Sequence, residues 1–328
     1  MLIIKKNKKK NIEKKFNKII SLNFFKYIKI FIIILILIIF INKNNIKVCL
    51  CVVGKLENNY IREFISYYKK YGVDKIFLYD NNDINGEKFD YILSDYIRKK
   101  YVKIYNIRGK IAQQIKIYQH CYTSNYKIFN WLIFIDIDEF IFLKNYNNIK
   151  DFLSQRKFNK CQSIYLNWVK HTDNNLIYYD NRTLHERFPE IYNKNNYCLG
   201  KTIIKGNLEN IKIKSVHILD GKIGRCNGLG NLFKPIYKIF CYKPDFNNNY
   251  IDHYEYKSTE EFINKIKKGD CTYGYNKNNM YIRINRYFRF NEITLEKISL
   301  ISQKTGLNIS LIKKNIQKLK IFKNISHI

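Results

Sequence analysis

Proline and glycine are scarce in this chain, with 3 and 13 among 328 residues. No linker rich in Gly, Ser or Pro divides residues 46–255, and no internal repeat is visible, which argues against a string of tethered modules or a solenoid. Aliphatic and aromatic residues are plentiful, so the chain can bury a sizeable core as one large domain or two small ones.

The cysteines form no Cys-x-x-Cys pair, which argues against a zinc ribbon or a thioredoxin-type site. They stand at Cys49, Cys51, Cys121, Cys161, Cys198, Cys226, Cys241 and Cys271. Cys49 and Cys51 are two apart in an apolar run, so we expect both to face one side of a strand as ordinary core residues. If the domain is lumenal some cysteines can pair, but the spacing does not give the connectivity.

Acidic residues are also few, 27 against 59 Lys and Arg, which gives a formal net charge of +32. Such an excess usually indicates nucleic acid or an anionic membrane surface as the partner. Here Lys, Asn, Ile and Tyr are abundant together in every region, as an A/T-biased coding sequence would produce. No nucleic-acid-binding motif or basic stripe occurs beyond residue 29, so nucleic acid is not an expected partner.

The N-terminus combines a basic tail with an apolar run. Residues 1–29 carry ten Lys and one Glu, and residues 24–41 form an 18-residue segment whose last twelve are uncharged. No small-residue cleavage site follows, so we expect an uncleaved transmembrane signal anchor. The positive-inside rule then predicts a single-pass type II membrane protein with a cytosolic N-terminus and a lumenal catalytic domain, in the Golgi or ER. A basic leader followed by a buried helix is the alternative.

Strand-like and helix-like segments alternate through the first half of the chain. Strands are predicted at 46–53, 73–79, 102–107 and 131–135, with helices at about 58–71, 89–97 and 111–124 between them. This order predicts an α/β domain over residues 46–255, with a mostly parallel, Rossmann-like sheet and helices on both faces. Residues 256–328 contain three helical patterns, the first opened by a Ser258–Glu261 capping box, and predict a C-terminal helical appendage.

Two aspartates, Asp136 and Asp138, directly follow the fourth predicted strand. Alternate residues of an extended segment point the same way, so both carboxylates can face one ligand while Ile137 faces the core. Two carboxylates make a hard oxygen site for Mn²⁺ or Mg²⁺, and a diphosphate bridged by such a metal is a stabilised leaving group. Polar residues also follow the first two strands, and ligands of parallel sheets bind at these carboxyl ends.

An Asp-x-Asp pair has other interpretations. Phosphohydrolases use the first Asp of such a pair as a nucleophile, but they place it after the first strand, whereas here it follows the fourth. Alternatively, Asp136 and Asp138 have no chemical role and only make the end of the strand and its loop polar. A third alternative is a basic, membrane-tethered binding protein without catalysis.

Motifs spread over residues 48–270 resemble glycosyltransferase family 92 and its family 2-like relatives. The matching residues are Lys55, Glu57, Glu63, Phe64, Tyr67, Gly72, Val73, Tyr79, Asp80, Asn81, Gln114, Tyr118, Cys121, Trp131, Asp136, Asp138, Glu139, Trp168, Glu186, Arg187, Phe188, Lys201, Thr202, Val216, His217, His253, Tyr254, Lys257, Ser258, Glu260, Glu261 and Phe262. Leu56 replaces the Asn usual in the first motif, and the segment after Trp168 departs from the family pattern.

The resemblance implies a GT-A fold, a nucleotide-diphosphate sugar donor, a divalent metal and a glycan, glycoprotein or glycolipid acceptor. Galactose from UDP-galactose is the family's characteristic donor. The resemblance assigns Asp136 and Asp138 to the metal and the diphosphate. GT-A enzymes often add a C-terminal histidine to the metal, which makes His217 the first candidate and His253 the second; either can instead be a satisfied structural histidine.

The donor pocket and the catalytic base complete the expected site. Lys55, Glu57, Asp80 and Asn81 are expected to line the donor pocket, with a solvated loop or an Asx turn as the alternatives. An inverting transfer needs a base that takes the acceptor's hydroxyl proton, and Glu186 and Asp173 are the candidates. Glu186 can instead form an ion pair with Arg187. We expect Arg283, Arg286 and Arg289 to form a solvated face of a helix.

Overall fold

The structure is a computed structural model that describes residues 27–34, 46–111, 113–192, 199–217, 224–234, 245–268 and 277–325, without the side chains of 277–279 and 318–325. The chain divides into two compact units, residues 1–46 and 47–328. In the first unit residues 27–34 are helical and exposed. No helix in the described ranges is long and apolar enough to cross a membrane. Most of the tail and anchor predicted within residues 1–41 lies outside these ranges, so the anchor, the topology and the compartment stay predictions.

Four parallel strands form the first half of the sheet in the second unit. They are β1 (Val48–Gly54), β2 (Lys75–Asp80), β3 (Val102–Asn106) and β4 (Trp131–Phe134), in the spatial order β3-β2-β1-β4. This half agrees with the predicted alternation of strands and helices, since parallel neighbours need a crossover helix between them.

The second half of the sheet is mixed, so a parallel arrangement throughout is confirmed only for the first half. The order continues with β7 (Gly200–Lys205), β6 (Ser163–Lys170), β9 (Asn249–His253) and β5 (Glu139–Leu143), and β8 (Arg225–Asn227) pairs with β6. The pairs β4–β7, β6–β7 and β5–β9 are antiparallel. Only a tight turn joins β4 to β5, which is too short for a parallel crossover, so β5 pairs with β9 instead.

Helices cover both faces of the parallel half, as predicted. On one face Cys51 of β1 forms a disulfide with Cys121 of α5 (Gln114–Asn125). On the other face a side chain at Gly54 would collide with Ile137 and with Phe89 of α3 (Phe89–Ile92). The helix α2 (Asn58–Lys70) packs beside α3 and places Phe64 edge-on against Phe140 of β5.

The expectation that Cys51 is an ordinary core residue is wrong, because Cys51 forms a disulfide with Cys121. Both Cys49 and Cys51 are buried on one side of β1, as expected, but only Cys49 is a free thiol among the described cysteines. A second disulfide joins Cys161 to Cys226. Neither pairing could be read from the spacing of the cysteines. Cys198, Cys241 and Cys271 lie outside the described residues.

The helix predicted over residues 89–97 is two short helices, α3 and α4 (Ser94–Arg98). Leu93 lies between them with φ −107° and ψ 14°, outside the helical range, while its own side chain is fully buried. The break is confined to Leu93, and the hydrogen bonds Leu93 N–H to Phe89 and Ile97 N–H to Leu93 continue across it. The remaining short elements are α6 (Ile149–Leu153), a 3₁₀ turn (Arg156–Phe158) and α7 (Leu184–Arg187).

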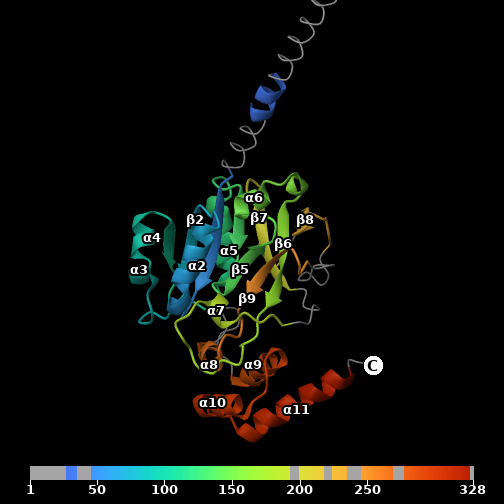
Figure 1. The fold of residues 1–328 in the computed structure, drawn as a ribbon. Coiled ribbons are helices and arrows are strands. Elements are labelled where there is room, and N and C mark those ends of the chain that lie inside the picture. Colours follow the sequence, from blue (N-terminus) through green and yellow to red (C-terminus); the bar gives the residue numbers. More distant parts are fainter. Residues whose placement is uncertain are drawn as a thin grey trace, which may run out of the picture. The chain divides into compact units, whose positions relative to one another are not determined.

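The C-terminal region contains α8 (Thr259–Lys268), α9 (Lys277–Phe290), α10 (Leu295–Thr305) and α11 (Ile309–Ile325), drawn orange to red in Figure 1. The predicted capping box is present: the Ser258 N–H donates to Glu261, and the Glu261 N–H donates to the Ser258 hydroxyl at 3.3 Å. These helices enclose an apolar cluster that includes Phe262, Tyr287 and Ile301. They also belong to the same compact unit as the sheet.

Ile137→Asp should lower the free energy of unfolding by more than about 3 kcal/mol, because it buries a carboxylate where Ile137 packs against Gly54 beside the apolar ring of Phe89. Ile84→Asp is the matched control, since Ile84 is 71% exposed and should lose almost nothing. Urea unfolding of both variants measures the difference. Equal stability of the two proteins would contradict the packing described for Ile137.

Candidate active site

The segment between β4 and β5 is a turn, so the two aspartates do not alternate along an extended strand as predicted. The Glu139 N–H donates to the Asp136 carbonyl at 3.2 Å, and Ile137 is buried as expected. The turn sends the two carboxylates to different partners. It also brings Glu139, the first residue of β5, beside Asp138.

Asp136 is held by residues from two other elements. Its carboxylate accepts a hydrogen bond from Gln114 of α5 at 2.7 Å and pairs with the ammonium of Lys201 of β7 at 2.8 Å. Lys201 is fully buried, and although burial alone would lower its pKa, Asp136 and Glu139 outweigh burial and raise it well above the usual value. Asp136 is therefore paired with a permanent cation.

Asp138 is surrounded by basic residues from the end of β9 and the segment that follows it. The Lys265 ammonium donates to its carboxylate at 2.9 Å, and the Lys257 ammonium and the His253 Nε2 lie 3.9 and 3.8 Å away. Burial opposes ionisation of Asp138, but Lys265, Lys257 and His253 outweigh it and hold its pKa well below the usual range. Asp138 is therefore ionised at neutral pH although it is buried.

Glu139 and His253 complete a candidate metal group with Asp138. One ligand atom from each of the three lies within 4.8 Å of the others. Burial raises the pKa of Glu139 well above its usual range and lowers that of His253 to about 4. The imidazole of His253 is therefore neutral at pH 7, which is the form that binds metals.

The donor set fits a divalent cation. Within the described part of the chain, the Glu139 Oε1 and the His253 Nδ1 are buried without a hydrogen-bond partner, although such atoms are normally satisfied in folded proteins. Two carboxylates and one imidazole suit Mn²⁺ or Mg²⁺. The structure thus groups Asp138 and His253 of the predicted ligands and adds Glu139, whereas Asp136 and His217 are not part of this group.

His217 lies close to the Asp136 side of the site. Its Nδ1 is 2.9 Å from the Gly200 carbonyl oxygen, and its ring meets Trp168 edge-on. Burial, followed by the charge of Lys201, lowers the pKa of His217 to about 4. These contacts are those of a satisfied histidine, and its role as a metal ligand stays a prediction.

A cavity of about 470 Å³ adjoins Asp138. It is lined by Leu56, Glu57, Asn59, Tyr60, Asp83, Glu87, Tyr179, Glu255, Tyr256, Lys257, Glu261, Asn264, Lys265 and Lys267. Lys257 and Lys265 connect it to the metal group, because both line the cavity and approach Asp138. The cavity lies at the carboxyl ends of β1 and β2, where parallel sheets bind ligands.

The residues predicted to line the donor pocket lie around this cavity in different ways. Glu57 lines it directly, and Lys55 pairs with Asp83 on its wall at 2.8 Å. Asp80 is buried and pairs with Arg108, while its second carboxylate oxygen accepts the Asn82 N–H at 3.0 Å. The Asp80 contacts are those of an Asx turn, which was the alternative interpretation.

Asn81 is the remaining predicted pocket residue. It is buried, and its amide donates to the Ile107 and Lys110 carbonyls at 3.1 and 2.7 Å. Asn81 thereby fixes the loop after β3 against the end of β2. The roles of Asp80 and Asn81 toward a donor stay predictions.

The two candidate bases have structural contacts. Asp173 is buried, accepts a hydrogen bond from Tyr287 and pairs with Lys297 of α10 at 2.7 Å, so it fastens the end of β6 to the C-terminal helices. Glu186 is exposed and closes a capping box at α7, where it accepts from the Thr183 N–H at 2.9 Å. Hydrogen bonds from Thr183 lower the pKa of Glu186, which makes it a weaker proton acceptor.

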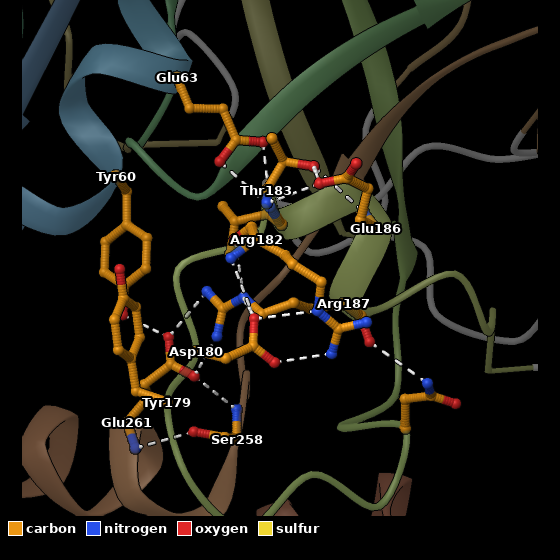
Figure 2. A network of polar contacts seen from close by, with 12 residues as sticks. Tyr60, Glu63, Tyr179, Asp180, Arg182, Thr183, Glu186, Arg187, Ser258 and Glu261 are labelled. Atoms are coloured by element: carbon orange, nitrogen blue, oxygen red, sulfur yellow. Dashed lines mark hydrogen bonds and ion pairs between the residues drawn. The ribbon is translucent and has the colours of Figure 1, made fainter.

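Arg187 pairs with Glu261 and not with Glu186, as Figure 2 shows. The Arg187 guanidinium is buried and contacts both carboxylate oxygens of Glu261, at 2.7 and 3.1 Å. Tyr60 of α2 donates to the same carboxylate, and the Leu184 N–H donates to Glu63. This network ties α2, α7 and α8 together along one wall of the cavity.

Sequence reasoning assigned no role to the lysines that neutralise the site. Lys201 and Lys257 are part of the motifs quoted above, but nothing in their spacing pairs them with carboxylates more than 60 residues away. Gln114 is also part of the quoted motifs, and its spacing of 22 residues from Asp136 does not predict their hydrogen bond either. Lys265 was absent from the motifs. Only the folded chain brings these residues to the aspartates.

The fold and site together define an α/β domain with an acidic metal-type site beside a ligand cavity at the carboxyl edge of its parallel strands. A family model described as Glycosyltransferase family 92 matches residues 44–302, and the chain belongs to this family.

Curated relatives match shorter stretches. A family 92 protein of Ricinus communis is 26% identical over 105 residues, which cover 32% of this chain and 19% of the relative. One of Arabidopsis thaliana is 28% identical over 134 residues, 38% of this chain and 22% of the relative. The chain thus spans about a fifth of the length of these relatives.

Solved structures are only distantly similar. The S. aureus TarS fragment in complex with UDP-GlcNAc aligns over 83% of this chain and 70% of its own, with 10% identity and a TM-score of 0.38. GalNAc-T7 with UDP, GalNAc and Mn²⁺ aligns over 39% of this chain and 23% of its own, with 13% identity and a TM-score of 0.29. At these scores the likeness carries no argument about the site.

The pKa of His217 makes stability depend on pH. Because the folded protein lowers this pKa from 6.5 to about 4, the unfolded chain takes up a proton first as the pH falls. Stability is therefore lost between about pH 6.5 and 4, and His217 accounts for on the order of 3 kcal/mol of that loss. His217→Gln should flatten the dependence, measured by urea unfolding from pH 7 to 4. His185→Gln, an exposed control, should keep the wild-type slope; an unchanged slope in His217→Gln would contradict the burial of His217.

Proposed function

We propose that this protein is a metal-dependent glycosyltransferase that moves a sugar from a nucleotide-diphosphate donor to a glycan or glycoconjugate acceptor, with inversion at the sugar carbon. The observation that carries the proposal is the group Asp138, Glu139 and His253 next to a cavity of about 470 Å³ at the carboxyl edge of the sheet. Membership of glycosyltransferase family 92 supports the reaction class.

Residues on one side of Asp138 would bind the metal, and residues on the other side would enclose the nucleotide sugar. Asp138, Glu139 and His253 would hold Mn²⁺ or Mg²⁺, which when bound would neutralise charge on the diphosphate leaving group. Glu57, Tyr60 and the residues around them would enclose the nucleotide sugar and exclude water from it. Asp136, held by Lys201 and Gln114, would keep the turn in place.

The donor follows from the family resemblance, which makes UDP-galactose the first candidate. A screen tests it: the full chain is incubated with Mn²⁺ and a panel of nucleotide sugars, and released nucleotide is measured. A phosphatase substrate such as p-nitrophenyl phosphate serves as a separate arm. Phosphate release from that ester, without turnover of any nucleotide sugar, would show a phosphohydrolase instead.

Asp138→Asn should reduce sugar transfer about a hundredfold or more and weaken metal and nucleotide binding together, since it removes the ionised ligand and keeps its size. Asp90→Asn, on the short helix α3 and exposed, is the matched control for a lost carboxylate and should behave as wild type. Nucleotide release and calorimetric metal binding give the two readouts. Full transfer with unchanged metal dependence in Asp138→Asn would refute the proposed site.

Glu186→Gln separates a catalytic role of Glu186 from its capping role. A glutamine oxygen can still accept the Thr183 N–H, so the thermal unfolding midpoint should stay within a few degrees of wild type. If Glu186 is the base, transfer falls by about a hundredfold while donor binding is unchanged. Unchanged turnover would remove Glu186 from the candidates and leave Asp173, which Asp173→Asn tests with the same two measurements.

A further inference from the structure

Lys257 differs from the other cations near Asp138 in how its ammonium is satisfied. Lys265 donates to Asp138 and to the Glu255 carbonyl, both at 2.9 Å. The Lys257 ammonium lies 3.8 Å from Glu57 and 3.9 Å from Asp138, too far for a hydrogen bond to either. Within the part of the chain that the structure describes, it makes no hydrogen bond, although an ammonium has three donors.

The position of Lys257 is closed on most sides. The residue is only 6% exposed, its ammonium lies over the ring of Tyr60 at 4.2 Å, and it lines the cavity beside Asp138. A buried cation without hydrogen bonds is costly, because its hydration is lost and not replaced. The attraction of Glu57 and Asp138 explains why the charge is tolerated, but it leaves the three donors directed at no acceptor.

The backbone of Lys257 is held in an unfavourable conformation. Its φ of 49° lies in the left-handed region, which a residue with a Cβ rarely adopts. The elements on either side impose it, since His253 ends β9 and Ser258 begins the capping box of α8. Strained residues of this kind cluster at ligand sites, where the surrounding fold keeps one side chain in a required place.

The cavity that Lys257 lines is otherwise rich in carboxylates. Glu57, Asp83, Glu87, Glu255 and Glu261 all line it, against the three lysines 257, 265 and 267. Lys265 is committed to Asp138 and Lys267 is exposed. Among the lysines that line this cavity in the described part of the chain, Lys257 is therefore the buried one whose three donors all remain available to an anionic ligand.

We propose that Lys257 is an anion-binding residue of the cavity, donating hydrogen bonds to a phosphate oxygen of a diphosphate group. The proposal rests on the proposed function, because it assigns the diphosphate of the donor to the Lys257 side of Asp138. Burial and the Tyr60 ring restrain the Lys257 side chain before the ligand arrives, so little side-chain entropy is lost on binding.

The test uses inorganic pyrophosphate as the probe, with and without Mg²⁺, and isothermal titration calorimetry of the full chain. Lys257→Met should weaken pyrophosphate binding about tenfold or more, as expected for the loss of a charge-assisted hydrogen bond. Lys314→Met, which removes an exposed lysine of α11, is the matched control and should bind like wild type. Thermal unfolding is measured for each protein.

A second variant, Lys257→Gly, separates the loss of the ammonium from a folding defect. Glycine adopts a positive φ without strain, so this variant removes the ammonium while relaxing the backbone. It should fold at least as well as Lys257→Met and show the same loss of pyrophosphate binding. If both variants fail to fold, Lys257 has a structural role and the proposal is overturned.

The outcomes also separate this inference from the proposed function. If wild type binds no pyrophosphate, or if Lys257→Met and Lys257→Gly bind it within twofold of wild type, the inference is overturned while sugar transfer can still be demonstrated. If pyrophosphate binding depends on Lys257 but no nucleotide sugar is turned over, Lys257 is confirmed as an anion-binding residue and the proposed function fails.

Discussion

The compensation of Asp138 by lysines is the interaction on which the rest of the site depends. Asp138 is buried, and an isolated buried carboxylate would simply become protonated. Lys265 and Lys257 keep it ionised, and both belong to the segment around α8. The C-terminal helical region therefore contributes charged residues to the site. The ion pairs Arg187–Glu261 and Asp173–Lys297 fix the position of this region. They thereby keep Lys257 and Lys265 close to Asp138.

The same charges give neighbouring carboxyl groups different states. Nearby cations hold the pKa of Asp138 well below its usual range, whereas burial raises the pKa of the adjacent Glu139 well above its own. A metal would compete with protons for Glu139, which couples metal binding to pH. Lys201 faces Asp136 and Glu139 from β7. The site is thus an alternating set of charges, in which each cation belongs to a different strand or helix from the carboxylate it neutralises.

The parallel half of the sheet could be predicted because its strands alternate with amphipathic helices, and that order leaves few topologies. The second half could not, since the direction of β5 depends on its pairing with β9, more than 100 residues later. Motifs singled out Asp138 and His253, which the structure places in one candidate metal group. Glu139 was missed because an extended strand would have pointed it away from Asp138, and only the turn after β4 reverses this. The capping role of Glu186 was overlooked although Thr183 stands three residues before it, in the spacing of a capping box.

The separation between Asp138 and Lys265 has a consequence for how the protein is made. The two residues are 127 positions apart, and the ribosome adds residues in order from the N-terminus. The β4–β5 turn therefore emerges well before the lysines that permit its burial, and until then Asp138 must stay in water or accept a proton. The edge of the sheet that carries the site should be the last part to close during synthesis. A nascent chain halted before α8 would hold its first four strands together while that edge stays hydrated and accessible to chaperones and proteases.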